Sequence, residues 1–135
     1  MPQTIRKGYK ALVAEAEAEI ETLSVDAAIA LHGDPDVVFI DLRDIRELDR
    51  SGRMPGAHHC PRGMLEFWVD PDSPYHKDIF ASGKRFLFYC ASAWRSALAT
   101  KAVQEMGLTP VGHIEGGFGN WKKSGGPVAE RPNKK

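Results

Sequence analysis

One short segment constrains the fold of this chain more than any other. The apolar run 86–89 ends directly on Cys90, and Arg95 follows after four intervening residues. Beyond Arg95, apolar residues recur at helical spacing over 98–106, which predicts a helix with one buried face. The cysteine is therefore expected in a short loop between a buried strand and the N-terminal end of a helix.

A loop in that position favours an anion. The first backbone N–H groups of a helix lack partners, and the helix macrodipole is positive at this end. The guanidinium of Arg95 adds to the same field, so we expect the Cys90 thiolate to be stabilised relative to the thiol. The alternative is a buried structural cysteine that closes the strand, and this segment alone leaves both interpretations open.

Length and composition narrow the classes of protein. The 135 residues are enough for one domain with its own core. Lys plus Arg and Asp plus Glu both number 18, so no charge excess indicates nucleic-acid or membrane-surface binding. No apolar run approaches the ~20 residues of a membrane span, and no signal-peptide core follows the start. The only cysteines, Cys60 and Cys90, fit a reducing compartment, so we predict a cytoplasmic location.

Strand-like and helix-like segments alternate along the chain. Continuous β-branched and aromatic runs predict buried strands, with a shorter strand before Pro61. Helices are expected after Ser24, in the charged patch after Asp41, after the cysteine loop and after Gly116-Gly117, with a short one at 75–80. The predicted strands are 37–40, 57–60, 86–89 and 111–114. This order predicts an α/β fold with a mostly parallel central sheet flanked by helices.

The two ends of the chain differ from the middle. Segment 8–22 is rich in Ala and Glu, which are good helix formers, and Leu12, Ala16 and Ile20 align on one side of such a helix. This stripe predicts docking on the domain or on a second copy of the chain, as a homodimer. We therefore predict an N-terminal helical extension at 1–22, a domain at 23–128 and a flexible tail at 129–135.

Three motifs in this order resemble the rhodanese-like family of single-domain sulfurtransferases over about residues 23–128. The first is Asp41-Leu42-Arg43, followed by Glu47 and the turn 52–57; the second is the loop from Cys90 to Arg95. The third is the closing pattern of Gly116-Gly117, Trp121, Gly125-Gly126 and Pro127-Val128. The resemblance implies a three-layer rhodanese-like fold with an extra N-terminal helix and with the cysteine at the base of a cradle-like loop.

The resemblance also implies a reaction. Cys90 would be the nucleophile that takes a sulfur atom from a small-molecule donor, such as thiosulfate, mercaptopyruvate or a low-molecular-weight persulfide, and holds it as a persulfide. The acceptor would be a thiol, a protein thiol or cyanide, and no cofactor is implied. The loop residues would surround the sulfur and bind the substrate, with their amides stabilising its charge: Ala91, Ser92, Ala93, Trp94 and Arg95.

Loop length separates two chemistries that share this architecture. Phosphatases with a catalytic cysteine have one more residue between the cysteine and the arginine, which makes room for a phosphate group. By resemblance, the four residues between Cys90 and Arg95 fit a single sulfur atom. A phosphatase or arsenate reductase is therefore the less favoured interpretation.

The chain departs from the family pattern at two positions. Arg53 stands where histidine is usual, and Ala93 stands where many loops have glycine, the one residue that reaches positive φ without strain.

Two side chains in the cysteine loop keep alternative roles. Arg95 either binds the donor's anionic group or folds back onto a carboxylate such as Asp41, and Ser92 either donates to the persulfide or caps the following helix.

The remaining candidates are interpreted as structural. Asp41, Arg43 and Glu47 have the spacing of an ion-pair brace near the site, with ligand binding by Asp41 and Arg43 at the carboxyl end of a strand as the alternative. Cys60 is interpreted as a small buried residue, with a resolving thiol for Cys90 as the alternative. His58 and His59 are adjacent and would point to opposite faces of a strand, so no metal site is predicted.

A rival of a different class remains. A rhodanese-like module could sense oxidants or bind a partner protein, with sulfur transfer only incidental. A reactive thiolate is also the group that hydrogen peroxide oxidises first, so an intact Cys90 fits both functions.

Overall fold

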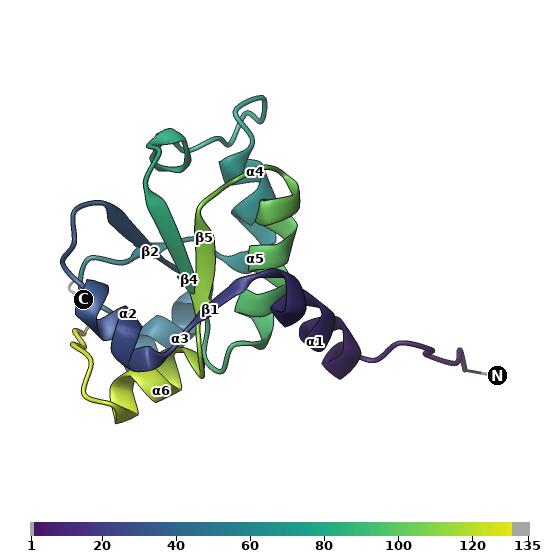
Figure 1. Ribbon diagram of the computed structural model, residues 1–135, viewed down its shortest axis with the longest axis horizontal. Coiled ribbons are helices and arrows are strands. Elements are labelled where there is room, and N and C mark those ends of the chain that lie inside the picture. The colour runs from purple at the N-terminus through teal and green to yellow at the C-terminus, as the bar shows by residue number, and fades with distance from the viewer. Residues whose placement is uncertain (1, 131–135) are drawn as a thin grey trace.

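A five-stranded parallel sheet forms the centre of the molecule (Figure 1). The computed structural model of the chain describes residues 2–130. The strand order is β1-β5-β4-β2-β3, and each neighbouring pair of these strands is parallel. The strands are β1 (Glu21–Leu23), β2 (Val37–Asp41), β3 (His58–His59), β4 (Arg85–Tyr89) and β5 (Val111–Ile114). The predicted α/β class is confirmed.

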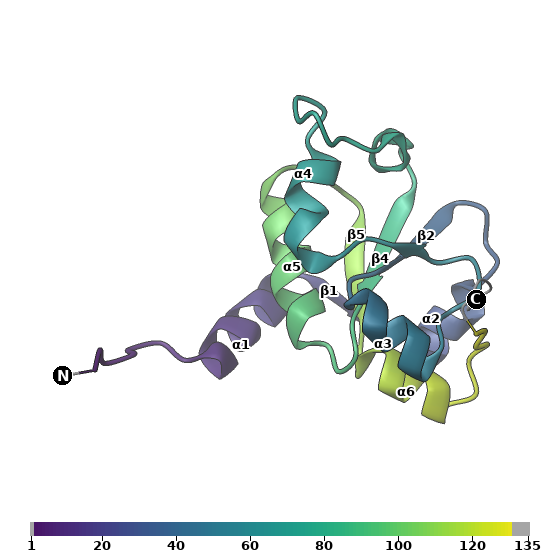
Figure 2. The ribbon, with the colours of Figure 1, turned by 180° about the vertical axis from the view of Figure 1, so that it is seen from behind.

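Helices cover both faces of this sheet. Figures 1 and 2 show α4 and α5 on one face and α2 and α6 on the other, which confirms the three-layer arrangement. The α-helices are α1 (Tyr9–Glu19), α2 (Val25–Leu31), α3 (Ile45–Ser51), α4 (Leu65–Val69), α5 (Trp94–Glu105) and α6 (Gly117–Lys123). Two short 3₁₀ helices, η1 (Arg62–Met64) and η2 (Asp78–Ala81), complete the fold.

The central strands are apolar on both sides because each side faces a layer of helices. Alternate residues of a strand point to opposite faces of the sheet. Val38, Ile40, Phe86 and Phe88 pack in one cluster with residues of α4 and α5. Phe39, Leu87 and Tyr89 pack in the other, with residues of α2 and α6. This double burial explains why β2 and β4 appear in the sequence as continuous apolar runs.

The register brings the carboxyl ends of three strands together. Asp41 at the end of β2 pairs with Tyr89 at the end of β4 and with His59 at the end of β3. In a parallel sheet these ends share one edge, where ligands usually bind. The loop from Cys90 to Ala93 begins at that edge, beside Asp41, and is the turn into α5 at the lower end of the molecule in Figure 1.

The N-terminal helix is shorter than predicted. It ends at Glu19, and Glu21–Leu23 form β1, which pairs with Gly112–Ile114 of β5. The prediction of a helix up to residue 22 was wrong because strand pairing overrides the weak local propensity of this segment. The predicted stripe is correct at Ala16 and Ile20, which pack with Val13 against Ala97 of α5, but not at Leu12, which is 42% exposed.

The outermost segments lie on either side of the domain. Residues 2–8 lead away from the body of the molecule in Figures 1 and 2. At the other end, Ala129 exchanges two backbone hydrogen bonds of 2.7 Å with Arg53, so ordered contacts continue past the predicted boundary at 128. Most of the predicted tail, residues 131–135, lies outside the described residues. No helix within residues 2–130 has the length and apolar character needed to cross a membrane.

The helix predicted at 75–80 was also wrong. Only the 3₁₀ helix η2 forms there, and it begins at Asp78. The side chains of Asp70 and Ser73 accept hydrogen bonds from backbone amides two residues further on, which stabilises turns in place of a helix.

Candidate active site

Cys90 directly follows β4, and its sulfur is held inside the turn that leads into α5. The backbone N–H of Ala93 donates to Sγ at 3.2 Å, and the residue is 1% exposed. The helical hydrogen bonds of α5 begin where Ala97 N–H donates to Ala93 O. The N–H groups of the first turn precede that bond and are available to an anion at the loop. The predicted placement of the cysteine at a helix N-terminus is therefore correct.

Ala93 adopts a backbone conformation that alanine normally avoids. Its φ is +94° and its ψ is −4°, and it is the one non-glycine residue with positive φ among residues 2–130. For an L-residue with a Cβ, this backbone conformation costs about 1–2 kcal/mol of conformational free energy. The position where many loops of the resembled family have glycine is therefore a strained one here, and its amide donates to the sulfur.

Arg95 folds back onto a carboxylate, but the carboxylate is not Asp41. Its Nη1 and Nη2 atoms donate to the two carboxylate oxygens of Glu47 at 2.8 and 3.0 Å. This hydrogen-bonded pair lowers the pKa of Glu47 to about 2 and raises the pKa of Arg95, to which the nearby Cys90 also contributes. Of the two roles left open for Arg95, the structure shows the bracing role.

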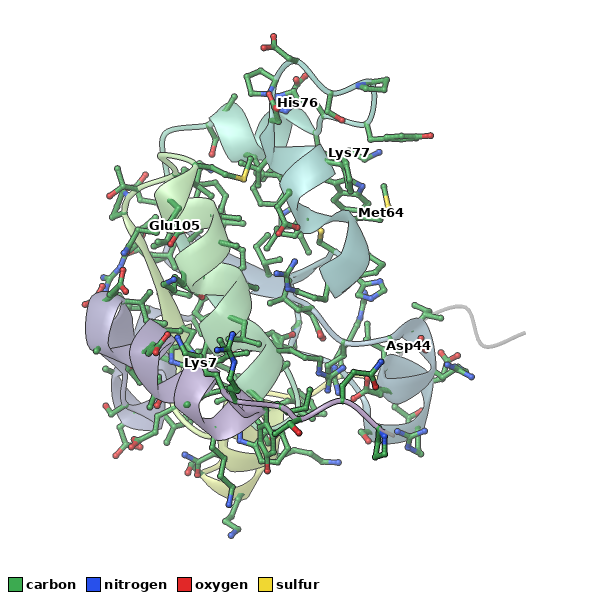
Figure 3. All side chains as sticks on the ribbon, turned by 90° about the vertical axis from the view of Figure 1, so that its right-hand side faces the viewer. Lys7, Asp44, Met64, His76, Lys77 and Glu105 are labelled. Atoms are coloured by element: carbon green, nitrogen blue, oxygen red, sulfur yellow. The ribbon has the colours of Figure 1, made fainter. Side chains whose placement is uncertain are left out.

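Glu47 is itself fixed by the start of α3. The backbone N–H of Asp44 donates to Glu47 Oε2 at 3.0 Å, and the side chain of Asp44 caps the first turn, which together form a capping box. Figure 3 shows Asp44 on the side of the molecule away from Glu105, the last residue of α5, and so toward the N-terminal end of that helix. The start of α3 therefore delivers Glu47 to Arg95.

Asp41 and Arg43 form a buried ion pair below the loop. Arg43 donates to Asp41 from Nη2 at 2.7 Å and from Nε at 2.9 Å, and both residues are 1% exposed. Tyr89 Oη also donates to Asp41, at 2.9 Å; burial raises the pKa of Tyr89, and the charge of Asp41 adds to the effect. Arg43 Nη2 further donates to Gly52 O at 2.9 Å. The predicted brace therefore consists of two pairs, Asp41 with Arg43 and Glu47 with Arg95.

The start of α6 holds the cysteine loop through its backbone. In the sequence, only the Gly116-Gly117 pair indicated this contact. The N–H groups of Phe118 and Gly119 donate to the carbonyl oxygens of Cys90 and Ala91, at 2.7 and 3.1 Å. Gly117, with φ +63°, sits so close that a Cβ would clash with the Cys90 carbonyl. A glycine is required at 117 for both reasons.

A buried histidine network also reaches the loop, and sequence reasoning missed it. Ser96 Oγ donates to Ala93 O at 3.2 Å and lies 2.9 Å from Nδ1 of His113, whose Nε2 lies 3.0 Å from Thr22 Oγ1. Because the serine proton goes to Ala93, the network assigns a proton to Nδ1 and makes Nε2 the acceptor from Thr22. Burial lowers the pKa of His113 to about 4, although the Glu17 carboxylate lies 3.7 Å away, so the imidazole is neutral at pH 7.

The remaining candidates, Ser92, Trp94 and Cys60, are not seen to hydrogen-bond to the sulfur of Cys90. Ser92 is exposed and does not cap α5, which has Ala93 at its N-cap and no side-chain cap, so the capping role predicted as one alternative is wrong. Trp94 is 53% exposed, and its ring lies 4.7 Å from that of Tyr9 in α1.

Burial raises the pKa of Cys60 to about 12, which argues against a resolving thiol. Within residues 2–130, no group of three or more His, Cys, Asp or Glu side chains is arranged to hold a metal ion.

Comparisons with known proteins agree with this fold. The family model of the rhodanese-like domain matches residues 24–124. No curated protein matches the chain.

Solved structures extend the comparison. A protein of unknown function from Rhodopseudomonas palustris, described as a possible tyrosine phosphatase, is 59% identical, with a TM-score of 0.93 over 95% of this chain and 98% of its own. The homodimeric polysulfide-sulfur transferase of Wolinella succinogenes is 30% identical, with a TM-score of 0.69 over 93% of this chain and 90% of its own. A single-domain sulfurtransferase of Saccharomyces cerevisiae, 20% identical, shares the fold with a TM-score of 0.64 over 83% of this chain and 96% of its own.

Replacing the strained alanine should stabilise the protein. Ala93→Gly removes the Cβ from a residue at φ +94°, and we expect the free energy of unfolding to rise by about 1 kcal/mol. Urea denaturation followed by circular dichroism measures the change. Ala102→Gly, in the interior of α5, is the matched control and should lower stability by about 1 kcal/mol. A loss of stability in both variants would show that Ala93 is not strained.

The buried His113 should make folding sensitive to mild acid. Its folded-state pKa of about 4 lies below the ~6.5 of an exposed histidine, so the unfolded state binds the proton first as the pH falls. The contribution of the neutral His113 to the free energy of unfolding is therefore fully present above pH ~6.5 and is lost as the pH falls toward 4. We expect the free energy of unfolding, measured in urea at pH 7, 6 and 5, to fall less steeply in His113→Asn than in the wild type. His58→Asn, at an exposed histidine, should keep the wild-type slope, and equal slopes in all three proteins would contradict the assignment.

Proposed function

Because the chain belongs to the rhodanese-like domain family, we propose that it is a sulfurtransferase in which Cys90 carries a sulfur atom as a persulfide. The observation that carries this proposal is the turn itself, in which the amide of Ala93 reaches Sγ at the start of α5. Nothing in the proposal requires a cofactor. The sulfurtransferase relatives support the general type of reaction.

The proposed cycle has two displacements at sulfur. The Cys90 thiolate attacks the outer sulfur of a donor R–S–SH, the S–S bond of the donor breaks, and R–SH leaves with the proton, which gives Cys90–S–S⁻. An acceptor thiolate then attacks the outer sulfur and releases the Cys90 thiolate, so neither step needs an external oxidant or reductant. The first-turn amides of α5 stabilise the anion on the terminal sulfur. No general base is needed when the thiolate is already present.

The charges at the loop favour one class of donor. Arg95 is the only cation among the loop residues, and Glu47 neutralises it with two hydrogen bonds. A compact dianion such as thiosulfate therefore meets no unpaired cation next to Cys90, whereas a persulfide needs none. We propose low-molecular-weight persulfides or polysulfide as the preferred donors, in line with the 30% identical polysulfide-sulfur transferase.

Two other functions compete with this proposal. The 59% identical protein is described as a possible tyrosine phosphatase. The short loop argues against phosphate, because the amide of Ala93 already closes on Sγ at 3.2 Å. The second competitor is an oxidant-sensing or protein-binding module. A homodimer through α1 and a cytoplasmic location stay predictions.

Intact-mass spectrometry tests the proposed function directly. After incubation with glutathione persulfide, we expect one added sulfur on the wild-type protein and none on Cys90→Ser, because only a thiolate at position 90 can carry it. The added sulfur should leave when cyanide or a thiol is supplied. Assays of the same samples with p-nitrophenyl phosphate and with hydrogen peroxide cover the two competing functions. An unloaded but alkylatable Cys90 would exclude the transferase.

Changing Glu47 should change donor preference. Glu47→Gln keeps a side chain that can complete the capping box but leaves Arg95 with its charge uncompensated. We expect KM for thiosulfate to fall about threefold to tenfold, while loading from glutathione persulfide changes little. Glu105→Gln, which removes the ion pair with Lys101 at the far end of α5 (Figure 3), is the control and should leave both donors unaffected. Slower loading from both donors in Glu47→Gln would mean that Glu47 only maintains the loop.

A further inference from the structure

A hollow of about 300 Å³ lies against the cysteine loop, between α3 and α6. Ala91, the residue after the cysteine, forms part of its wall, and Gly119 beside it donates its N–H to Ala91 O at 3.1 Å. The other lining residues are Arg43, Glu47, Arg50, Ser51, Phe118 and Lys122. The mechanism described above uses the loop but leaves this hollow without a role.

Two cations in the wall lack a carboxylate partner within residues 2–130: Arg50 of α3 and Lys122 of α6. The single hydrogen bond of Lys122 goes to a carbonyl, Ser51 O, at 3.1 Å. By contrast, Arg43 is neutralised by Asp41, and Glu47 by Arg95. The hollow therefore has an excess of positive charge from two side chains.

Carboxylates on the other side of these cations belong to a separate hollow. Asp49 and Glu130 line that second cavity, which shares Arg50 and Lys122 as a common wall. The face toward the cysteine loop has only one carboxylate, that of Glu47, and it is already bound by Arg95. An anionic group in the hollow beside the loop is therefore next to two cations, and the one carboxylate there is already bound by Arg95.

The floor and the entrance of the hollow suit an extended ligand. The Arg43 guanidinium lies 4.2 Å from the centroid of the Phe118 ring, and both side chains are buried, which gives a flat and rigid floor. At Gly119, a Cβ would lie 3.4 Å from Ala91 O. Gly119 therefore adds no side chain to the hollow at the point where the hollow meets the loop.

We propose that this hollow binds a carboxylate of a low-molecular-weight thiol or of its persulfide, held by Arg50 and Lys122 while the sulfur reacts at Cys90. The inference rests on the proposed function and specifies its substrate class. Thiosulfate has its charge on the atoms next to the reacting sulfur and carries no second charged group further away. A peptide-like thiol has carboxylates several atoms from its sulfur, because each residue of an extended chain spans about 3.5 Å. The loop thus selects against compact dianions, and the hollow selects for charge placed several atoms from the sulfur.

Two persulfides that differ in the carboxylate test the inference. Glutathione persulfide carries carboxylates, and 2-hydroxyethyl persulfide carries none. For Lys122→Glu, alone and with Arg50→Gln, we expect KM for glutathione persulfide to rise about tenfold with kcat unchanged, because only binding of the remote charge is lost. Loading from 2-hydroxyethyl persulfide should stay the same. Lys123→Glu makes the same charge change at the next residue of α6, outside the hollow, and should affect neither donor.

The outcomes separate this inference from the function on which it rests. Equal losses with both persulfides, or equal behaviour of Lys122→Glu and Lys123→Glu, would overturn the carboxylate site while leaving sulfur transfer intact. Calorimetry with S-methylglutathione, which cannot transfer sulfur, measures the hollow alone. We expect it to bind the wild type and Lys123→Glu about tenfold more tightly than Lys122→Glu. No binding to the wild type at millimolar ligand would reject the hollow, whereas binding without loading would reject only the transferase.

Discussion

The buried carboxylate of Asp41 is the contact on which the site depends. It accepts hydrogen bonds from the Arg43 side chain and from Tyr89 Oη, and so joins the ends of β2 and β4 at one level. Arg43 in turn lies over the ring of Phe118, whose N–H holds the Cys90 carbonyl. A short series of contacts therefore links the strand ends to the backbone of the cysteine. Loss of one member of a buried ion pair leaves an uncompensated charge, typically at a cost of about 3–5 kcal/mol, so the position of Cys90 is strongly determined.

Pairing of the charged side chains has a consequence for chemistry at the sulfur. Arg43 and Arg95 both approach the loop, yet each is matched by a carboxylate. The field that stabilises an anion at Cys90 then comes mainly from backbone N–H groups at the start of α5, which are fixed by the helix and need no counter-charge. In the proposed sulfur transfer, such a field depends little on which donor delivers the sulfur, so discrimination among donors would fall to side chains at the edge of the site.

The sequence predicted the parts of the fold that depend on local patterns. The runs at 37–40 and 86–89 are continuously apolar because these strands are buried on both faces, and the segment 111–114 also forms a strand, as predicted. It missed β1, since Glu21–Leu23 has no strand pattern and is ordered by pairing with β5. It left the role of Arg95 open and offered Asp41 as an example of a carboxylate partner; the actual partner, Glu47, is 48 residues away in the chain and is brought near by the start of α3. Local periodicity cannot report contacts of that kind.

Ala93 shows how those non-local contacts shape the loop. Alanine has no intrinsic preference for φ +94°, so the conformation must be maintained by neighbours. Ser96 Oγ accepts a hydrogen bond from His113 Nδ1 and donates one to the carbonyl of Ala93, while Thr22 in β1 donates to His113 Nε2. The edge strand that the sequence did not indicate is therefore connected to the turn that holds Sγ. Strain at a single residue near the cysteine is offset by a buried network that spans β1, β5 and α5, which makes the loop geometry a property of the whole fold.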